Sequence, residues 1–340
     1  MPSSRNSQTP VFLTGSTALC IMRAALACGH AMPASSAWRP DASAPVQADV
    51  ERAAQRVQAE LPGFELQHPV HVLVGGDMKC RPGSMHVSHA CTTQLPRGAF
   101  WRLAPGVYVA TPQLCFVRAA AEKQLPNVAL LELAFELCGT YATPRTAAVE
   151  ETLYDAAPLC TSDELRSYAA RCTGVSGARK AERLLRYAAD GSASPRETKL
   201  ALLLGLPQMR GGVGLGIPQM NYGVTASREA SLIAGRTSFR CDLCWPDAKL
   251  DVEYQSRFAH SNERSRIDDS RRANALRAMG WDVVAVTNDE LDSVTATDVI
   301  IRTLARALGK RIRVRVSDYR QRQLALRLEL GLPIGSWSVH

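Results

Sequence analysis

The stretch RCDLCWPDAKLDVEYQ, residues 240–255, decides the architecture of the C-terminal half of the chain. Two apolar runs flank turn residues around Pro246, a pattern typical of two paired β-strands. Asp242 and Glu253 lie one on each run. Pairing across the turn would therefore bring both carboxylates near one end of the sheet and onto one side. The expected strands cover residues 236–243 and 250–255.

Helices and strands alternate around this hairpin. Upstream, the run Ser194-Pro195-Arg196-Glu197 is typical of a helix start, with Ser as the N-cap, Pro at the first helical position and Glu three residues after the cap. Downstream, a helix with one apolar side ends at Gly280, and a buried strand runs from Trp281 to Thr287. This order predicts a mixed α/β fold. The expected helices cover residues 195–204, 267–279 and 294–308.

The N-terminal half predicts a smaller α+β domain. Val70–Val74 is strand-like, residues 100–109 resemble a hairpin, and apolar residues at helical spacing follow from Pro112 to Gly139. Turn residues at Asp190-Gly191-Ser192 mark a boundary. We expect an N-terminal domain over residues 1–190, a second domain over 191–310 and a basic C-terminal extension over 311–340.

Composition is that of an ordinary globular protein. The 340 residues are 46% apolar and 21% charged, which excludes a disordered, collagen-like or coiled-coil chain. The net charge is +8, and 22 Lys/Arg against 16 Asp/Glu from residue 191 onward place +6 of it in the second half. This surplus is compatible with a polyanionic partner, or with a solvated basic surface.

Cysteine usage and hydropathy predict a cytoplasmic protein without a membrane segment. The ten cysteines have irregular spacing, and we expect them to be reduced thiols. The most apolar early stretch, Val11–Met32, contains Arg23 and His30 and is interrupted by Thr14-Gly15-Ser16. It is better explained as a capped helix with one buried face.

The paired carboxylates suit a hard divalent cation, Mg²⁺ or Mn²⁺, because such ions take oxygen ligands and keep waters for a substrate. Glu197 could add a third oxygen from the preceding helix, although a helix start also favours Glu at that position. Carboxylates inside apolar strands need a partner. The alternative to a metal is therefore buried ion pairs of Asp242 and Glu253 with Arg236, Arg240 or Lys249.

Three segments together resemble a nuclease family. Residues 240–246, 249–254 and 269–281 are similar to the endonuclease-like domain related to very-short-patch-repair endonucleases, within the PD-(D/E)XK superfamily. The match covers roughly residues 190–308. It implies a restriction-endonuclease-like mixed sheet flanked by helices, acting on DNA. It also implies metal ligation by Asp242, Glu253 and the Tyr254 carbonyl, with Glu197 as the helix-borne acid.

One position departs from the family pattern. The superfamily places a Lys, or in this subgroup an Asp, two residues after the Glu, whereas this chain has Gln255. Gln can hold a water but cannot act as a general base. His260 fits a later family position, where it could contact the scissile phosphate or protonate the leaving group; an exposed loop histidine is the alternative.

Basic residues recur around the helix after the predicted site. Arg264, Arg266, Arg271 and Arg272 are candidates for phosphate contact, and a solvated charged face is the alternative. Arg311, Arg313 and Arg315 alternate with apolar residues, which predicts a strand or extended edge with one basic face.

Other motifs have structural explanations. Cys241 and Cys244 have half of a zinc-site spacing, but a strand would place them on opposite faces. The histidines and cysteines of residues 80–91 are expected in a solvated turn, with zinc as the alternative. The glycines of residues 211–216 lack the strand, helix and Lys-Ser/Thr of a nucleotide loop, and a tight bend accounts for them.

The first half is similar to the front end of AbiEi-type antitoxin and regulator proteins, through residues 106–112 and the helices after them. This resemblance implies a homodimer or a cognate toxin partner. The whole sequence therefore predicts a metal-dependent DNA endonuclease in phage defence, toxin–antitoxin or DNA repair. The alternative is a catalytically inactive nucleic-acid-binding or antitoxin-like regulator, which Gln255 favours.

Overall fold

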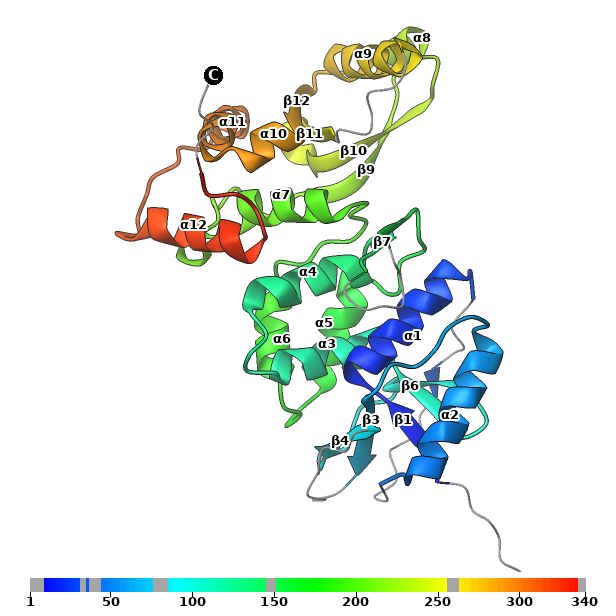
Figure 1. Cartoon of the computed structure of the whole chain (residues 1–340). Coiled ribbons are helices and arrows are strands. Elements are labelled where there is room, and N and C mark those ends of the chain that lie inside the picture. The colour runs from blue at the N-terminus through cyan, green and yellow to red at the C-terminus, as the bar shows by residue number, and fades with distance from the viewer. Residues whose placement is uncertain are drawn as a thin grey trace, which may run out of the picture. The chain divides into compact units, whose positions relative to one another are not determined.

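A computed structural model of the chain describes residues 9–30, 35–36, 44–75, 85–144, 151–255 and 263–335. The chain divides into two compact units (Figure 1). Met1–Leu125 and Glu136–Arg186 form the N-terminal unit, and Pro126–Phe135 and Tyr187–His340 form the C-terminal unit. Both units mix helices and strands, so the predicted α/β class is confirmed. Across the described ranges, every helix is too short or too polar to span a bilayer.

The N-terminal unit contains a six-stranded mixed sheet in the order β2-β5-β6-β1-β3-β4. The predicted strand at Val70–Val74 and the hairpin after residue 100 are both present. β1 was not expected: this three-residue strand pairs in parallel with β6 and antiparallel with β3. The solvated turn expected for the histidines and cysteines of residues 80–91 is wrong for residues 86–91, which form a strand parallel to β3, and Cys80 lies outside the described residues. The strands are β1 (Val11–Leu13), β2 (Ser35–Ser36), β3 (Val70–Gly75), β4 (His86–Cys91), β5 (Phe100–Ala104) and β6 (Val107–Ala110).

Helices pack on this sheet and bury one internal ion pair. Arg23 of α1 donates to Glu136 at 2.7 Å, and both side chains are about 5% exposed. Glu136 also accepts from the backbone N–H and the hydroxyl of Thr143, so its buried charge is hydrogen-bonded. The remaining elements are α1 (Gly15–Ala27), α2 (Gln47–Glu60), α3 (Pro112–Ala121), α4 (Asn127–Leu137, partly in the other unit), β7 (Tyr141–Ala142), β8 (Leu153–Tyr154), α5 (Ser162–Arg171) and α6 (Ala178–Leu185).

The C-terminal unit is built on a four-stranded sheet in the order β12-β11-β10-β9. β9, β10 and β11 are antiparallel neighbours, and β12 joins β11 in parallel. The predicted hairpin is confirmed, since β10 and β11 are joined by a short 3₁₀ turn over Pro246–Ala248 and by Lys249 in the left-handed region. The strands are β9 (Gln219–Thr225), β10 (Ser238–Trp245), β11 (Leu250–Gln255) and β12 (Asp282–Thr287).

Helices flank this sheet. α7 packs against β10 and α9 against β12 (Figure 1). Phe239, Cys241, Cys244 and Leu276 belong to one buried core cluster of this unit. Residues 311–316 form neither helix nor strand, so of the two alternatives predicted there, a strand or an extended edge, the strand is wrong. A helix begins after this segment, at Tyr319. The helices are α7 (Pro195–Gly205), α8 (Arg228–Ala234), α9 (Glu263–Ala278), α10 (Asn288–Asp292), α11 (Val294–Ala307) and α12 (Tyr319–Glu329).

Candidate functional site

The regular pairing of β10 with β11 ends next to Asp242. The register runs Trp245↔Leu250, Cys244↔Asp251 and Leu243↔Val252, and its continuation sets Asp242 opposite Glu253. At that position the Asp242 Oδ2 accepts a 2.9 Å hydrogen bond from the Tyr254 backbone N–H. A side chain thus takes the place of a backbone acceptor at this end of the hairpin.

Three predicted acids lie within electrostatic range of one another. Burial, followed by the neighbouring charges of Glu253 and Glu197, raises the pKa of Asp242 to about 8. Burial also raises the pKa of Glu197, with a contribution from Glu253. The three carboxyl groups come from β10, β11 and α7. Together they create a region of negative potential that a single arginine, Arg272, compensates only in part.

Glu197 is also part of the cap of α7. Its Oε2 accepts from the Ala193 N–H at 3.0 Å, and its Oε1 accepts from the Ser194 hydroxyl at 2.9 Å. The Ser194 oxygen in turn accepts from the Glu197 N–H at 3.1 Å. The predicted capping role is therefore present, and the same hydrogen bonds hold the carboxylate in place beside the other two acids.

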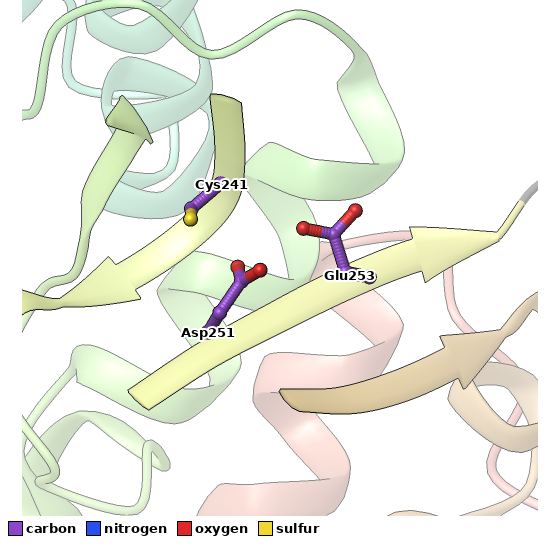
Figure 2. Close-up of side chains that lie close together, drawn as sticks. All are labelled: Cys241, Asp251 and Glu253. Atoms are coloured by element: carbon purple, nitrogen blue, oxygen red, sulfur yellow. The ribbon is translucent and has the colours of Figure 1, made fainter. Parts of the chain in front are cut away.

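The tightest group of possible metal ligands is a different one. In the described residues, Cys241, Asp251 and Glu253 alone form a set of three or more whose ligand atoms all lie within 4.8 Å of one another (Figure 2). Neither Asp242 nor Glu197 belongs to it. Sequence reasoning missed Asp251, although its position two residues before Glu253 puts both side chains on one face of β11.

Asp251 is completely buried and poorly compensated. Its side chain has 0% exposure, and neither carboxylate oxygen has a hydrogen-bond partner. Burial, followed by the neighbouring Glu253 carboxyl, raises the pKa of Asp251 to about 11. The nearest opposite charge is Arg272, whose Nη2 lies 3.7 Å from Oδ2.

Cys241 and Cys244 are neighbours, which corrects the expectation that they point to opposite faces. Cys244 is the largest cause of a raised pKa of the Cys241 thiol, ahead of burial. Both residues are fully buried. The regular alternation of a strand therefore does not hold between these two residues, in the part of β10 where the Asp242 side chain accepts from the Tyr254 N–H. All nine cysteines in the described ranges are free thiols.

Arg272 reaches the acids from α9. Its Nη2 lies 2.5 Å from Glu253 Oε1, and the same nitrogen donates to the Arg240 carbonyl oxygen. Burial opposes its charge, but the carboxylates of Glu253 and Asp251 raise the pKa of Arg272 overall. Arg272 is thus the ion-pair partner of Glu253. Of the alternatives considered from sequence, Arg236 pairs with Asp268 at 3.8 Å and Lys249 donates to the Met279 carbonyl.

The other predicted residues have varied positions. Tyr254 donates its N–H toward β10; because the N–H and C=O of one strand residue point to the same edge, its carbonyl faces β10 as well. Gln255 is exposed at the end of β11, and Arg271 is exposed on α9. Arg264 and Arg266 belong to the α9 backbone. Their side chains, and the whole of His260, lie outside the described residues.

Comparison with known proteins gives two weak relatives. Two uncharacterized proteins of Mycobacterium tuberculosis, from strains CDC 1551 / Oshkosh and ATCC 25618 / H37Rv, are each 26% identical over 135 residues. The match covers 39% of this chain and 44% of each relative. No family model matches the chain, and no solved structure does.

Proposed function

We propose that the chain is a metal-dependent phosphodiester hydrolase of the PD-(D/E)XK type that acts on DNA. The observation that carries this proposal is the set of three carboxyl groups, Glu197, Asp242 and Glu253, gathered from one helix and two adjacent strands. Burial, followed by the negative charges of Glu253 and Glu197, raises the pKa of Asp242 to about 8, and the charge of Arg272 offsets this negative potential only in part. A divalent cation would relieve it.

The fold around the acids supports the proposal. A helix bearing Glu197 precedes a mixed sheet, and the two acidic strands are adjacent and central in it. This is the order expected of a restriction-endonuclease-like domain. Residues 311–316 and α12 belong to the same compact unit as the sheet.

The oxygen donors present fit Mg²⁺ or Mn²⁺. Asp242, Glu253 and the Tyr254 carbonyl would hold the ion, since hard cations prefer carboxylate and carbonyl oxygens. When bound, such an ion neutralises phosphate charge and lowers the pKa of a coordinated water.

The surrounding residues have their own parts in this chemistry. Glu197, fixed by its capping hydrogen bonds and with a raised pKa, can orient a water and accept its proton. Gln255 can hold a water without charge, and His260 is proposed to contact the phosphate. When a cation binds, the ion pair between Arg272 and Glu253 must weaken, because Arg272 and the cation compete for the same carboxylate.

The Arg272–Glu253 ion pair also favours a second candidate. An arginine that neutralises the acidic strand permanently would leave a nucleic-acid-binding or antitoxin-like regulator without catalysis. In either case we propose that the chain binds DNA and is located in the cytoplasm. We also propose that the N-terminal unit mediates self-association or binds a cognate toxin.

A nicking assay separates the two candidates. Supercoiled plasmid is incubated with the full chain and Mg²⁺ or Mn²⁺, and compared with Asp242→Asn, Glu253→Gln and the control Asp247→Asn, whose carboxylate is exposed on the same hairpin. We expect cleavage by the wild type and the control, and at least a 100-fold loss in the other two. If the wild type cleaves the plasmid with neither Mg²⁺ nor Mn²⁺, the proposed endonuclease activity is overturned. Retained DNA binding, followed by fluorescence anisotropy, would then support the regulator.

A further inference from the structure

Asp251 is an unexplained feature of the C-terminal unit. A carboxylate with 0% exposure and two oxygens without hydrogen-bond partners is costly, because burial of an uncompensated polar group is unfavourable by several kcal/mol. It lies in the middle of the sheet, opposite Cys244 in register and between β10 and β12. The nearest positive charge is Arg272 at 3.7 Å, so a cation bound next to Asp251 would compensate it better than its neighbours in the fold do.

The side chains around Asp251 supply the rest of a ligand set. Figure 2 shows the Cys241 sulfur turned toward the Asp251 carboxyl group, with Glu253 next on the same strand. The three ligand atoms lie within 4.8 Å of one another, and ligands of one tetrahedral ion lie about 3.5 Å apart. A small movement of the side chains would therefore close them on one ion.

The donor chemistry selects the class of ion. A thiolate with two carboxylates suits a borderline cation such as Zn²⁺, whereas Mg²⁺ and Mn²⁺ prefer oxygen alone. We propose that Cys241, Asp251 and Glu253 form a second cation site that binds Zn²⁺ or a chemically similar ion. Cys244, the neighbour of Cys241, positions its sulfur, and Arg272 balances the excess negative charge of the ligands.

This site is separate from the proposed catalytic one, although the two share Glu253. Asp242 and Glu197 stay outside it. The inference does not depend on nuclease activity, since a buried zinc-class ion would stabilise the β10–β11 hairpin in a regulator as well.

Cobalt substitution of the full chain tests the proposal, because Co²⁺ bound to a thiolate gives a sulfur-to-metal charge-transfer band. The chain is stripped with a chelator and titrated with Co²⁺ and then with Zn²⁺. We expect a charge-transfer band that saturates at one equivalent of Co²⁺ and that Zn²⁺ abolishes, and a higher unfolding temperature with Zn²⁺. No band and no Zn²⁺-dependent shift in the wild type overturn the site, and show that Asp251 is buried as the neutral acid.

Two variants and two controls assign the ligands. Cys241→Ser should lose the band, and Asp251→Asn should bind Co²⁺ at least tenfold more weakly. Asp251→Asn removes a buried carboxylate, so it keeps the test decisive if Cys241→Ser does not fold. Cys160→Ser, a buried thiol of the other unit, and Asp242→Asn should both retain the band. Loss of the band in these controls, or its survival in both ligand variants, contradicts the assignment. Asp242→Asn also separates this site from the proposed nuclease, because it should abolish cleavage and leave the Co²⁺ charge-transfer band unchanged.

Discussion

Arg272 on α9 and Glu253 on β11 form an ion pair at 2.5 Å, and the same guanidinium nitrogen lies 3.7 Å from Asp251. The side chains of Arg272 and Glu253 are only 18% and 17% exposed. One helix residue is therefore the positive neighbour of two strand carboxylates, and it pairs closely with Glu253 alone. The same ion pair therefore affects both the stability of the sheet and the electrostatic potential at the candidate site.

Removal of the positive charge of Arg272 should destabilise the C-terminal unit. Arg272→Gln leaves Glu253 and Asp251 without their positive partner, and loss of one member of a buried pair costs about 3 kcal/mol. We expect this loss in the free energy of unfolding measured with urea, and partial recovery when Mg²⁺ is added. Arg271→Gln is the matched control, because Arg271 is adjacent and exposed, and should change stability by less than about 0.5 kcal/mol. Equal effects of the two substitutions would contradict the role of Arg272.

The two roles of Glu197 can be separated with its capping partner. Ser194→Ala removes the N-cap acceptor of α7 and should cost about 1 kcal/mol of stability. It should lower cleavage less than a change of Glu197 itself, because the Ala193 N–H still holds the Glu197 carboxylate. Glu197→Gln keeps an acceptor for the Ser194 hydroxyl but loses the charge, so it should lower plasmid cleavage by at least tenfold with a smaller change in stability. Chemical denaturation and the nicking assay measure the two effects. Equal activity of Glu197→Gln and the wild type would reduce Glu197 to a cap.

Local sequence patterns predicted the elements that carry the site. The turn at Pro246–Ala248 and the cap at Ser194 have strong short-range signals, and both appear where expected. β1 has no such signal. Its three residues are a strand only because β3 and β6, far along the chain, lie on either side of them.

The details of the site depended on tertiary contacts that no periodicity contains. Alternation along a strand separates Cys241 from Cys244, whereas the two thiols are neighbours in the folded unit. Arg272 belongs to a helix pattern that gives no indication of its partner, which is set by the packing of α9. Asp251 was predictable in part, since Glu253 lies two residues away on the same face.

The glycine-rich segment is expected to be structural. A Cβ on Gly212 would lie 2.1 Å from the Leu206 carbonyl oxygen, so Gly212→Ala forces the backbone apart and should destabilise by about 3 kcal/mol. Gly214→Asn is the control: Gly214 has φ +84°, which Asn tolerates better than other residues, and no atom within 4 Å of its Cβ position. The thermal unfolding temperature of Gly212→Ala should be well below that of Gly214→Asn. The reverse order would point to a ligand-binding role for the segment.

A histidine pair should give the N-terminal unit an acid-sensitive stability. His71 Nδ1 and His89 Nε2 are 2.8 Å apart. Burial, His71 and Arg118 lower the pKa of His89 to about 4. The unfolded chain therefore binds a proton near pH 6.5 that the folded chain takes up only near pH 4. The contribution of His89 to the free energy of unfolding should be fully present above about pH 6.5 and should be lost as the pH falls toward 4.

His89→Gln removes the titrating ring and should flatten this part of the stability–pH profile, measured by urea unfolding at each pH. His86→Gln, on the same strand, is the control and should keep the wild-type slope. An unchanged slope in His89→Gln would assign the acid sensitivity to other groups.

DNA binding should depend on an exposed basic segment after α11. Arg311, Arg313 and Arg315 are exposed, and the Gln208 side chain holds their backbone by donating to the Arg313 carbonyl and accepting from the Arg315 N–H. Because the backbone is fixed by these bonds, replacement of the three side chains with Gln should leave the fold intact. For every phosphate that the triple variant no longer neutralises, the slope of log affinity against log salt should become shallower by about 0.9.

A second triple variant with the same change in net charge serves as the control. Arg179, Arg183 and Arg186 of the N-terminal unit are exposed, and their replacement with Gln removes the same three charges. Anisotropy titrations of a labelled duplex over a range of salt should show a shallower slope for the first triple variant than for the second. Identical slopes would mean that net charge alone attracts DNA, and that the segment at 311–315 makes no specific contact with phosphates.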